Sequence, residues 1–374
     1  MRGASLSEEP RGPTAALFAR LHLDLPLLLG LLLLCAFGLF VLYSAGDASS
    51  GQVQRQGIRL AVAFGALFAL AQVPPALMRR GALPLFGLGL LLLLAVLLVG
   101  DVGKGAQRWL DLGVIRFQPS EILKLAVPMA LAWFLSLGPL PPSLPRVLIA
   151  AAMVAVPVLL IAKQPDLGTA LLVASAGGLV LFLAGLRWRW IVLMTALAAL
   201  AAPVLWSLMR PYQRQRVLTF LDPSSDPLGA GYHIIQSQIA IGSGGVYGKG
   251  WLHGTQSQLA FLPERSTDFI FAVIGEELGL VGILILLALY LFVVLRGLYI
   301  ASRARNSFGR LLAGSLTLVF FVYLFVNTGM VVGLLPVVGV PLPLISYGGT
   351  SLVTIMAGFG MVMSIHTHRK LLQS

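Results

Sequence analysis

Long stretches of apolar residues dominate this chain and limit what it can fold into. Ten of them follow one another, each close to the roughly 20 residues that a helix needs to cross a bilayer. The run Leu27–Leu34 contains no polar residue, whereas strands of a transmembrane barrel alternate apolar and polar positions. Only 11% of the residues are charged, against about 25% in soluble domains. The sequence therefore predicts an all-α polytopic membrane protein with about ten transmembrane helices.

The loops between the apolar runs predict the orientation of the chain. With ten spans both termini lie on one side, and the short loops on that side carry arginines and no acid. The positive-inside rule places that side in the cytoplasm. We expect a cytoplasmic tail at 1–24 without a cleavable signal peptide, then one ten-helix domain at 25–374 with a large extracytoplasmic loop at 208–268 between spans 7 and 8. The spans are predicted at 25–43, 57–73, 83–100, 120–136, 144–162, 168–186, 190–207, 269–295, 310–335 and 348–366.

The charges point to chemistry at the outer face. The net charge of +12 is explained by topology or by anionic lipid, so we expect no nucleic-acid partner. Apart from Glu8, Glu9 and Asp24, the other eleven of the fourteen acids fall in or near the outer loops. Basic residues that the topology rule does not place there accompany them, which indicates that an anionic molecule is handled on that face. They are Lys104, Arg108, Arg116, Lys163, Arg210, Arg214, Arg216, Lys249 and Arg265.

Asp268 is the main candidate for a catalytic residue. It ends the polar stretch that contains Gly254–Ser257 and Glu264, and it stands at the lip of a predicted span. A carboxylate at that depth is costly unless it is paired or functional. The alternative is structural, because Thr267 or Asp268 would also serve as an N-cap of the following helix.

Further charged residues occur where spans begin or end. Glu121 and Lys124 are three residues apart on one helical face, and an ion pair within a membrane usually marks a site or fixes a fold. Lys163 and Asp166 flank Pro165, where the charges either cap a tight turn or join the site. Glu276 and Glu277 lie in an apolar helix, and they are either paired structurally with an arginine or catalytic.

Other polar segments support or exclude particular functions. Trp109 reads either as an interfacial aromatic or as a platform for a sugar, with Arg108 beside it to grip phosphate. The broken segment 341–350 is expected to line a polar cavity, because unpaired backbone groups are tolerated there. The glycine-rich run 241–250 lacks the residues of a phosphate loop and predicts a flexible loop instead. A helix at the membrane interface is expected over 232–241, and neither the five histidines nor the single Cys35 makes a metal motif.

Several motifs together resemble the SEDS (shape, elongation, division, sporulation) family. They are Gly105–Trp109, Gln118–Glu121 with Lys124, Lys163–Thr169, Asp222–Gly231, Ile234–Glu277 and Pro341–Gly349. The stretches Gly254–Ser257 and Leu262–Arg265 are similar to the RodA (elongation) branch, while Ser266 stands where relatives often have histidine.

The resemblance implies a peptidoglycan glycosyltransferase that polymerises lipid II at the outer face of the bacterial cytoplasmic (inner) membrane, with a class B penicillin-binding protein as partner. It carries the essential acid onto Asp268 and the supporting charges onto Glu121 and Lys124. We add Arg108, Trp109, Asp166 and Glu264 as supporting residues. Predicted substrate contacts are Lys163, Arg210, Arg216, Lys249, Thr255, Gln256, Ser257 and Ser346. A divalent cation, Mg or Mn, is a candidate cofactor that these residues do not identify.

The residues agree with the chemistry that this activity needs. Polyprenyl pyrophosphate departs as an anion, so the transfer needs cations and one base, whereas glycoside hydrolysis needs two carboxylates. Asp268 would be that base, or would orient the acceptor or a divalent ion. A lipid II flippase is the competing hypothesis, because ten spans with broken helices and membrane charges also suit a transporter. A non-catalytic scaffold for a cell-wall enzyme is a third hypothesis.

Overall fold

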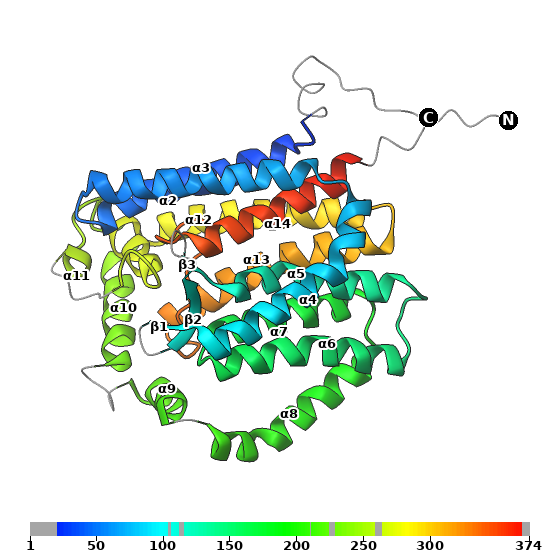
Figure 1. The fold of residues 1–374 in the computed structure, drawn as a ribbon. Helices are drawn as coiled ribbons and strands as arrows, with labels where there is room; N and C mark the ends of the chain where they lie inside the picture. Colours follow the sequence, from blue (N-terminus) through cyan, green and yellow to red (C-terminus); the bar gives the residue numbers. More distant parts are fainter. Residues whose placement is uncertain are drawn as a thin grey trace.

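The computed structural model describes residues 21–103, 106–111, 116–209, 211–223, 229–258 and 264–368. Within these ranges ten long helices coincide with the ten predicted apolar runs (Figure 1). Six of them, α2, α4, α6, α12, α13 and α14, are long and apolar enough to cross a membrane, and α7 is a shorter apolar helix. The chain is therefore a multi-pass helical membrane protein, and the count of ten spans stays a prediction. The helices are α2 (Leu25–Ala45), α3 (Ser50–Gln72), α4 (Pro75–Val99), α5 (Pro119–Ser136), α6 (Leu144–Lys163), α7 (Leu167–Leu183), α8 (Trp188–Leu208), α12 (Ile270–Ser302), α13 (Ser307–Val331) and α14 (Thr350–Thr367).

Short polar side chains start several of these helices. Asp24 accepts a hydrogen bond from the amide of Leu27 at the start of α2, and Asn306 accepts one from Gly309 at the start of α13. Such caps satisfy amide groups that have no partner within the helix. The helix boundaries are thus encoded by residues that flank the apolar runs.

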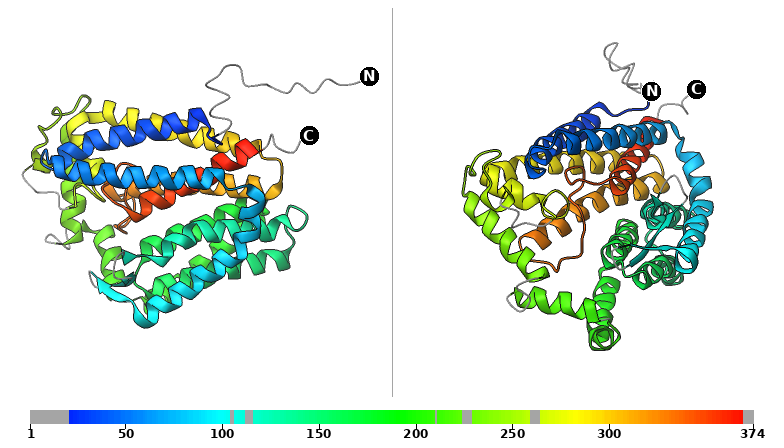
Figure 2. Two further views of the ribbon diagram at one scale, coloured as in Figure 1. Left: turned by 45° about the horizontal axis from the view of Figure 1, so that its top comes forward. Right: turned by 60° about the vertical axis from the view of Figure 1, so that its left-hand side comes forward.

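The long helices lie alongside one another, and α13 joins the two parts of the bundle. It packs against α12 on one side and against α5 and α7 on the other. Figure 2 shows α2, α3, α12 and α14 grouped together, with α4 to α7 in the second group. Because α13 is largely buried between them, its polar side chains are positioned to reach segments from both groups.

The long connection between α8 and α12 gathers at one end of the bundle. It contains α9 (Pro211–Leu221), α10 (Ala230–Gly244) and α11 (Thr255–Gln258), and α10 runs crosswise over the ends of the long helices (Figure 1). The helix predicted at 232–241 is confirmed as part of α10. The described chain begins and ends at the opposite end, where the rings of His22 and His368 stack at 4.0 Å.

A small antiparallel sheet, which the sequence did not predict, lies between α4 and α5. Its strands are β1 (Asp101–Gly103), β2 (Ala106–Asp111) and β3 (Arg116–Phe117), in the order β1-β2-β3. Val102 pairs with Gln107, and Leu110 pairs with Phe117. The sheet places Arg108 and Trp109, both half-buried, near the start of α5.

The segment between α13 and α14, residues 332–349, is not helical and enters the bundle. The Tyr290 hydroxyl in α12 donates to the carbonyl of Pro343, and a Cβ built on Gly38 in α2 would lie 2.7 Å from the carbonyl oxygen of Leu344. Contacts with the middle of two long helices show that this re-entrant segment reaches deep into the protein. Several of its backbone groups are hydrogen-bonded to protein, among them those of Val340, Leu342 and Pro343, as a bilayer requires.

Candidate functional site

Asp268 lies in a tight turn, residues 264–269, directly before α12. The turn is closed by hydrogen bonds from the amides of Thr267 and Phe269 to the carbonyl of Glu264, at 3.0 and 3.3 Å. The N-cap of α12 is Phe269, and that helix has no side-chain cap hydrogen bond. Neither Thr267 nor Asp268 is therefore the N-cap residue of α12.

Residues from other elements fix the backbone of this turn. Asn327, fully buried in α13, donates one hydrogen bond to the carbonyl of Asp268 and another to that of Val340, both at 2.8 Å. The Ser346 hydroxyl donates to the carbonyl of Thr267 at 2.5 Å, and the Tyr347 amide donates to that of Ser266 at 2.8 Å. The turn and the re-entrant segment are thus held together as one unit.

The side chain of Asp268 faces the re-entrant segment. It is half-buried, and a Cβ built on Gly339 would lie 3.4 Å from Asp268 Oδ2. Gly339 has a φ of +71°, a conformation that favours glycine. Asp268 therefore approaches the re-entrant segment where glycine leaves room for it, and the residue remains partly exposed.

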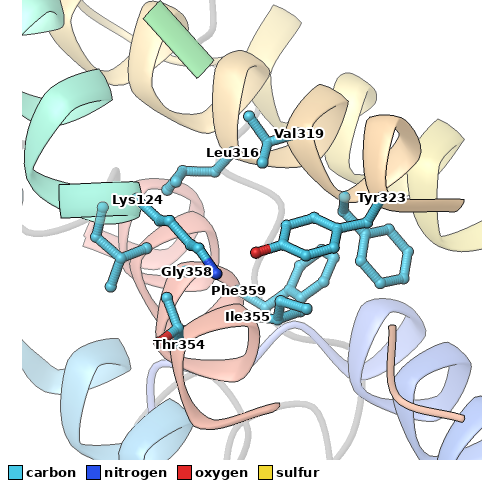
Figure 3. Close-up of a pocket in the computed structure, with 10 residues that line it drawn as sticks. Lys124, Leu316, Val319, Tyr323, Thr354, Ile355, Gly358 and Phe359 are labelled. Carbon is cyan, nitrogen blue, oxygen red and sulfur yellow. The ribbon is translucent and has the colours of Figure 1, made fainter. Parts of the chain in front are cut away.

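Glu121 and Lys124 form a buried ion pair, as their spacing predicted. Lys124 Nζ lies 2.7 Å from Glu121 Oε1, and both side chains are almost fully buried. Lys124 also lies 5.5 Å from the ring centre of Tyr323 in α13. Figure 3 shows the Tyr323 hydroxyl and the Lys124 ammonium directed into one cavity, which α14 also lines with Thr354 and Phe359. The volume open to the centre of a water molecule in this cavity is about 30 Å³, so the cavity can hold a water molecule.

Asp166 joins three predicted features at the start of α7. Its Oδ1 accepts from the Thr169 amide at 3.2 Å, so it caps the helix. Its Oδ2 accepts from Gln118 at 3.0 Å and lies 3.9 Å from Arg108 Nε. Arg108 also donates to the carbonyl of Pro165. The cap interpretation is confirmed for Asp166, and the same carboxylate holds the sheet near α5 and α7.

Lys249 is half-buried and forms an ion pair with α12. Its ammonium lies 2.9 Å from Glu276 Oε1, and the same oxygen accepts from the Thr255 hydroxyl and the Gln256 amide. Glu277 accepts a hydrogen bond from the Ser44 hydroxyl in α2 at 2.6 Å. Glu276 is thus paired with a lysine and Glu277 is hydrogen-bonded to a serine, where pairing with an arginine was the structural alternative. Lys249, Thr255 and Gln256 lie together around Glu276, and their predicted contacts with substrate stay predictions.

The glycine-rich run is part of this arrangement. Residues 241–244 complete α10, and the amides of Lys249 and Gly250 donate to the carbonyls of Glu276 and Glu277. The partner backbone is exposed by a break in α12 at Gly279, where φ is +63°. The run 241–250 is therefore partly helical and hydrogen-bonded to α12, whereas we expected a flexible loop.

The remaining predicted residues lie around the same end of the protein. Lys163 is exposed at the end of α6, and Arg216 is half-buried in α9. Glu264 is exposed and accepts a hydrogen bond from Thr267. Ser257 lies in α11, and Arg210 lies outside the described residues. The substrate contacts of Lys163, Arg210, Arg216 and Ser257 stay predictions, and so does the supporting role of Glu264.

The sequence reasoning missed a group on α3. Gln56 is buried and donates to the carbonyl of Ser346 at 3.3 Å, while Arg55 Nε donates to the Tyr347 hydroxyl at 3.3 Å. The guanidinium of Arg59 lies 4.2 Å above the Tyr347 ring. Arg59, inside the predicted span 57–73, and Arg55, just before it, were a signal that could have revealed this group.

A site for a divalent cation made from protein side chains alone is not evident. No group of three or more His, Cys, Asp or Glu side chains that could hold a metal ion occurs among the described residues. The described residues therefore do not provide such a site, and a need for a divalent cation stays a prediction.

The fold and the polar groups at one end define a class: a multi-pass helical membrane protein with a carboxylate site fixed by a re-entrant segment. The family model described as a cell cycle protein of the FtsW, RodA and SpoVE group matches residues 22–371, and the chain belongs to this family.

Relatives of known sequence or structure agree with this assignment. Peptidoglycan glycosyltransferase MrdB of Escherichia coli K12 is 58% identical over 94% of this chain and 96% of its own. A probable peptidoglycan glycosyltransferase FtsW of Geobacter sulfurreducens is 37% identical over 93% of this chain and 96% of its own. A solved chain of a peptidoglycan synthase complex, 36% identical, aligns over 93% of this chain and 98% of its own with a TM-score of 0.81. The rod-shape-determining protein RodA of Thermus thermophilus is 31% identical, and its structure aligns over 93% of this chain and 97% of its own with a TM-score of 0.71.

Proposed function

We propose that this protein is a peptidoglycan glycosyltransferase of the RodA type, which polymerises lipid II during cell elongation. Relatives that share its fold over almost the whole chain are named for this activity. The observation that carries the proposal is the turn of Asp268, because its backbone is fixed from α13 and from the re-entrant segment while its carboxylate stays partly accessible.

In the proposed reaction Asp268 is the general base. It accepts the proton of the acceptor sugar hydroxyl while that oxygen forms a bond to the anomeric carbon of the donor. The bond from this carbon to the diphosphate breaks, and the diphosphate leaves with the bonding electrons. The leaving group is already an anion, so a single carboxylate suffices.

Cations around the site would stabilise the departing diphosphate. Lys163 is exposed and Arg216 is half-buried, so both are available as the contacts predicted from sequence. Lys249 and Arg108 are engaged with carboxylates. Lys249 stays a proposed contact of the diphosphate, and Arg108 is proposed to support the wall of the site. Neutralising Lys163 or Arg216 should weaken lipid II binding in a titration, and unchanged binding would remove that residue from the mechanism.

The decisive experiment is polymerisation of purified lipid II by the full chain, alone and with a class B penicillin-binding protein. Wild type should produce long glycan strands, and Asp268→Asn should bind lipid II and produce none. Asp222→Asn is a matched control on the same connection, because Asp222 is exposed at the end of α9. Undiminished polymer from Asp268→Asn would overturn the role of this residue.

A lipid II flippase remains the competing function. Alternating access places essential charges near the membrane midplane. Here Asp166, Asp268 and Glu264 stand at helix starts or in the turn before α12, and Glu121 lies in the first turn of α5. This placement favours surface chemistry. No polymer from wild type, with partner and divalent ions present, combined with lipid II translocation in vesicles, would decide for the flippase.

The cellular setting belongs to the same proposal. A relative of this fold occurs in a peptidoglycan synthase complex described as coordinating polymerization and crosslinking. A class B penicillin-binding protein is therefore the proposed partner, with both termini in the cytoplasm and the site outside the bacterial inner membrane. A divalent cation carried by the substrate diphosphate is the proposed form of any metal requirement.

A further inference from the structure

One face of α3 carries two arginines and two exposed apolar residues. Arg55, Ile58, Arg59 and Val62 are spaced three and four apart, so they share one side of the helix. The opposite side packs on α14 through Gln56, Leu60, Ala63, Leu67 and Ala71, all buried. The face with the arginines is thus turned away from the helix packing.

The two guanidiniums converge on Tyr347. Arg55 donates to its hydroxyl and Arg59 lies over its ring, so both charges are held on one side of the re-entrant segment. Neither arginine forms an ion pair with a carboxylate in the part of the chain that the structure describes. The hydrogen bond from Arg55 and the charge of Arg59 lower the pKa of Tyr347 below its ordinary value of 10.0. The local potential is therefore positive and uncompensated.

The start of α14 adds to this positive field. Its N-cap is Gly349, without a side-chain cap hydrogen bond, and a Cβ built there would lie 3.7 Å from Arg59 Cδ. Amide groups in the first turn of a helix carry partial positive charge and bind phosphate. The glycine at 349 thus brings the start of α14 close to the side chain of Arg59.

Apolar surface continues from the arginines along the same face. Ile58 and Val62 are 67% and 58% exposed, and both lie further into the span than Arg55. Charge at the outer end and apolar surface below it match a lipid whose head group carries phosphate. Ordinary surface arginine clusters lack this second half.

We propose that Arg55 and Arg59 of α3 bind the diphosphate of a polyprenyl-linked molecule, with its chain along Ile58 and Val62. Guanidinium groups bind phosphate oxygens in a bidentate manner. The inference rests on the proposed polymerase function, because the substrate and the leaving group of that reaction both carry this diphosphate. It extends that function to a group of residues on α3 that approach Asp268 through Tyr347 and Ser266.

The test measures binding of polyprenyl diphosphate to the full-length protein in nanodiscs of neutral lipid. Arg55→Gln and Arg59→Gln should each weaken binding about tenfold, since each removes a charge-assisted contact. The matched control is Arg303→Gln, because Arg303 also lies over a tyrosine ring, that of Tyr299, but beyond the other end of α12. The contact with the polyprenyl chain is tested by Ile58→Ser, which should weaken binding. Leu98 is an exposed leucine on α4, and Leu98→Ser should leave binding unchanged.

Two further probes separate the sources of phosphate. Phosphatidylglycerol offers one phosphate on a lipid, and inorganic diphosphate offers the head group without a chain, so both should compete poorly. Equal binding of phosphatidylglycerol would overturn the assignment to a polyprenyl diphosphate. Unchanged affinity in both arginine variants would overturn the site itself.

Folding and activity are followed in the same preparations. If Arg59→Gln fails to fold, Arg59→Lys is the replacement, because it keeps the charge and loses the bidentate guanidinium. It should bind with intermediate affinity. Wild-type affinity in that variant would count against bidentate binding of phosphate by Arg59. Polymerisation by wild type with normal binding in the glutamine variants would refute only this inference. A clear binding contrast without any polymerisation by wild type would refute only the proposed function.

Discussion

Asn327 is the residue on which the position of Asp268 depends most directly. Its amide group reaches two carbonyl oxygens, one in the Asp268 turn and one in the re-entrant segment, from a buried place in α13. A buried carbonyl that loses its donor keeps its full desolvation cost. A single side chain therefore connects the helix core with the candidate base.

Asn327→Ala should lower polymerisation strongly without changing Asp268 itself. Loss of two buried hydrogen bonds is expected to cost about 1–3 kcal/mol for each unsatisfied carbonyl, and the turn should lose its fixed position. Polymerisation rate and thermal unfolding are the two measurements. Thr328→Val is the control, because its hydroxyl bonds back to Leu324 in the same helix. Full activity in Asn327→Ala would show that the turn is held by other contacts.

A second prediction concerns the opposite end of the protein. Asp24 is buried and receives two hydrogen bonds from Arg296, at 2.9 and 2.6 Å. Arg296→Ala leaves this carboxylate without its cation, so stability should fall by about 3–5 kcal/mol. Arg310→Ala, an exposed arginine at the start of α13, should have little effect. Equal unfolding temperatures for the two variants would contradict the assigned importance of the pair.

Residues of both kinds show what a sequence can predict at this scale. Glu121 with Lys124 was predictable because the partners are three positions apart on one helix. The contacts of Asn327 and Gln56 were not predictable. Asn327 bonds to Asp268, 59 positions away, and Gln56 bonds to Ser346, 290 positions away. A polar residue in an apolar run signals a constraint, but only the fold shows which backbone it reaches.

At the scale of elements, the re-entrant segment depends on close contact with the start of α7. A Cβ built on Gly168 would lie 2.7 Å from the carbonyl oxygen of Val338, next to the Gly339 that faces Asp268. Real side chains do not approach a backbone oxygen so closely, so any larger residue must push the segment away. Helix α7 thus sets the position of one wall of the site.

Gly168→Ala should therefore reduce both stability and polymerisation. Overpacking of a tight contact usually costs about 1–3 kcal/mol. The same helix provides the control in Gly178, where nothing lies within 4 Å of an added Cβ. Gly178→Ala should be neutral or slightly stabilising, since alanine favours a helix over glycine. Comparable losses in both variants, measured by unfolding and by product length, would disprove the contact argument.

The elements were predicted unequally well from sequence. All ten apolar runs are helices, since length and composition alone determine that outcome in a membrane. The sheet over 101–117 and the depth of the re-entrant segment were not predicted. Short strands give a weak pattern, and the depth of a loop depends on glycines such as Gly38 in distant helices.

On the scale of the whole molecule, the first and last described segments contact each other, and we call this contact the terminal clasp. His22 stacks on His368, and His366 lies 3.5 Å from the Asp24 carboxylate that Arg296 also binds. Burial, and the charge of His368, lower the pKa of His22 below its ordinary value of 6.5. The terminal clasp therefore favours a neutral His22.

This direction predicts a stability that depends on pH. A histidine whose pKa is lowered on folding contributes fully above 6.5, and its contribution is lost as the pH falls through the folded value. The thermal unfolding temperature of wild type should fall when the pH is lowered from about 7.5 to about 5.5. His22→Phe retains a stacking ring without the titration and should show a smaller decline. Parallel curves would exclude His22 as the cause.

The link between Asp268 and the re-entrant segment has a consequence for biosynthesis. Ribosomes deliver the turn of Asp268 long before residues 327–347, which supply its fixed backbone contacts. A nascent chain that has inserted α12 therefore carries its carboxylate in an unfinished turn. The candidate site is therefore complete only after residues 327–347 have been made, so chains released before that point would reach the membrane without it.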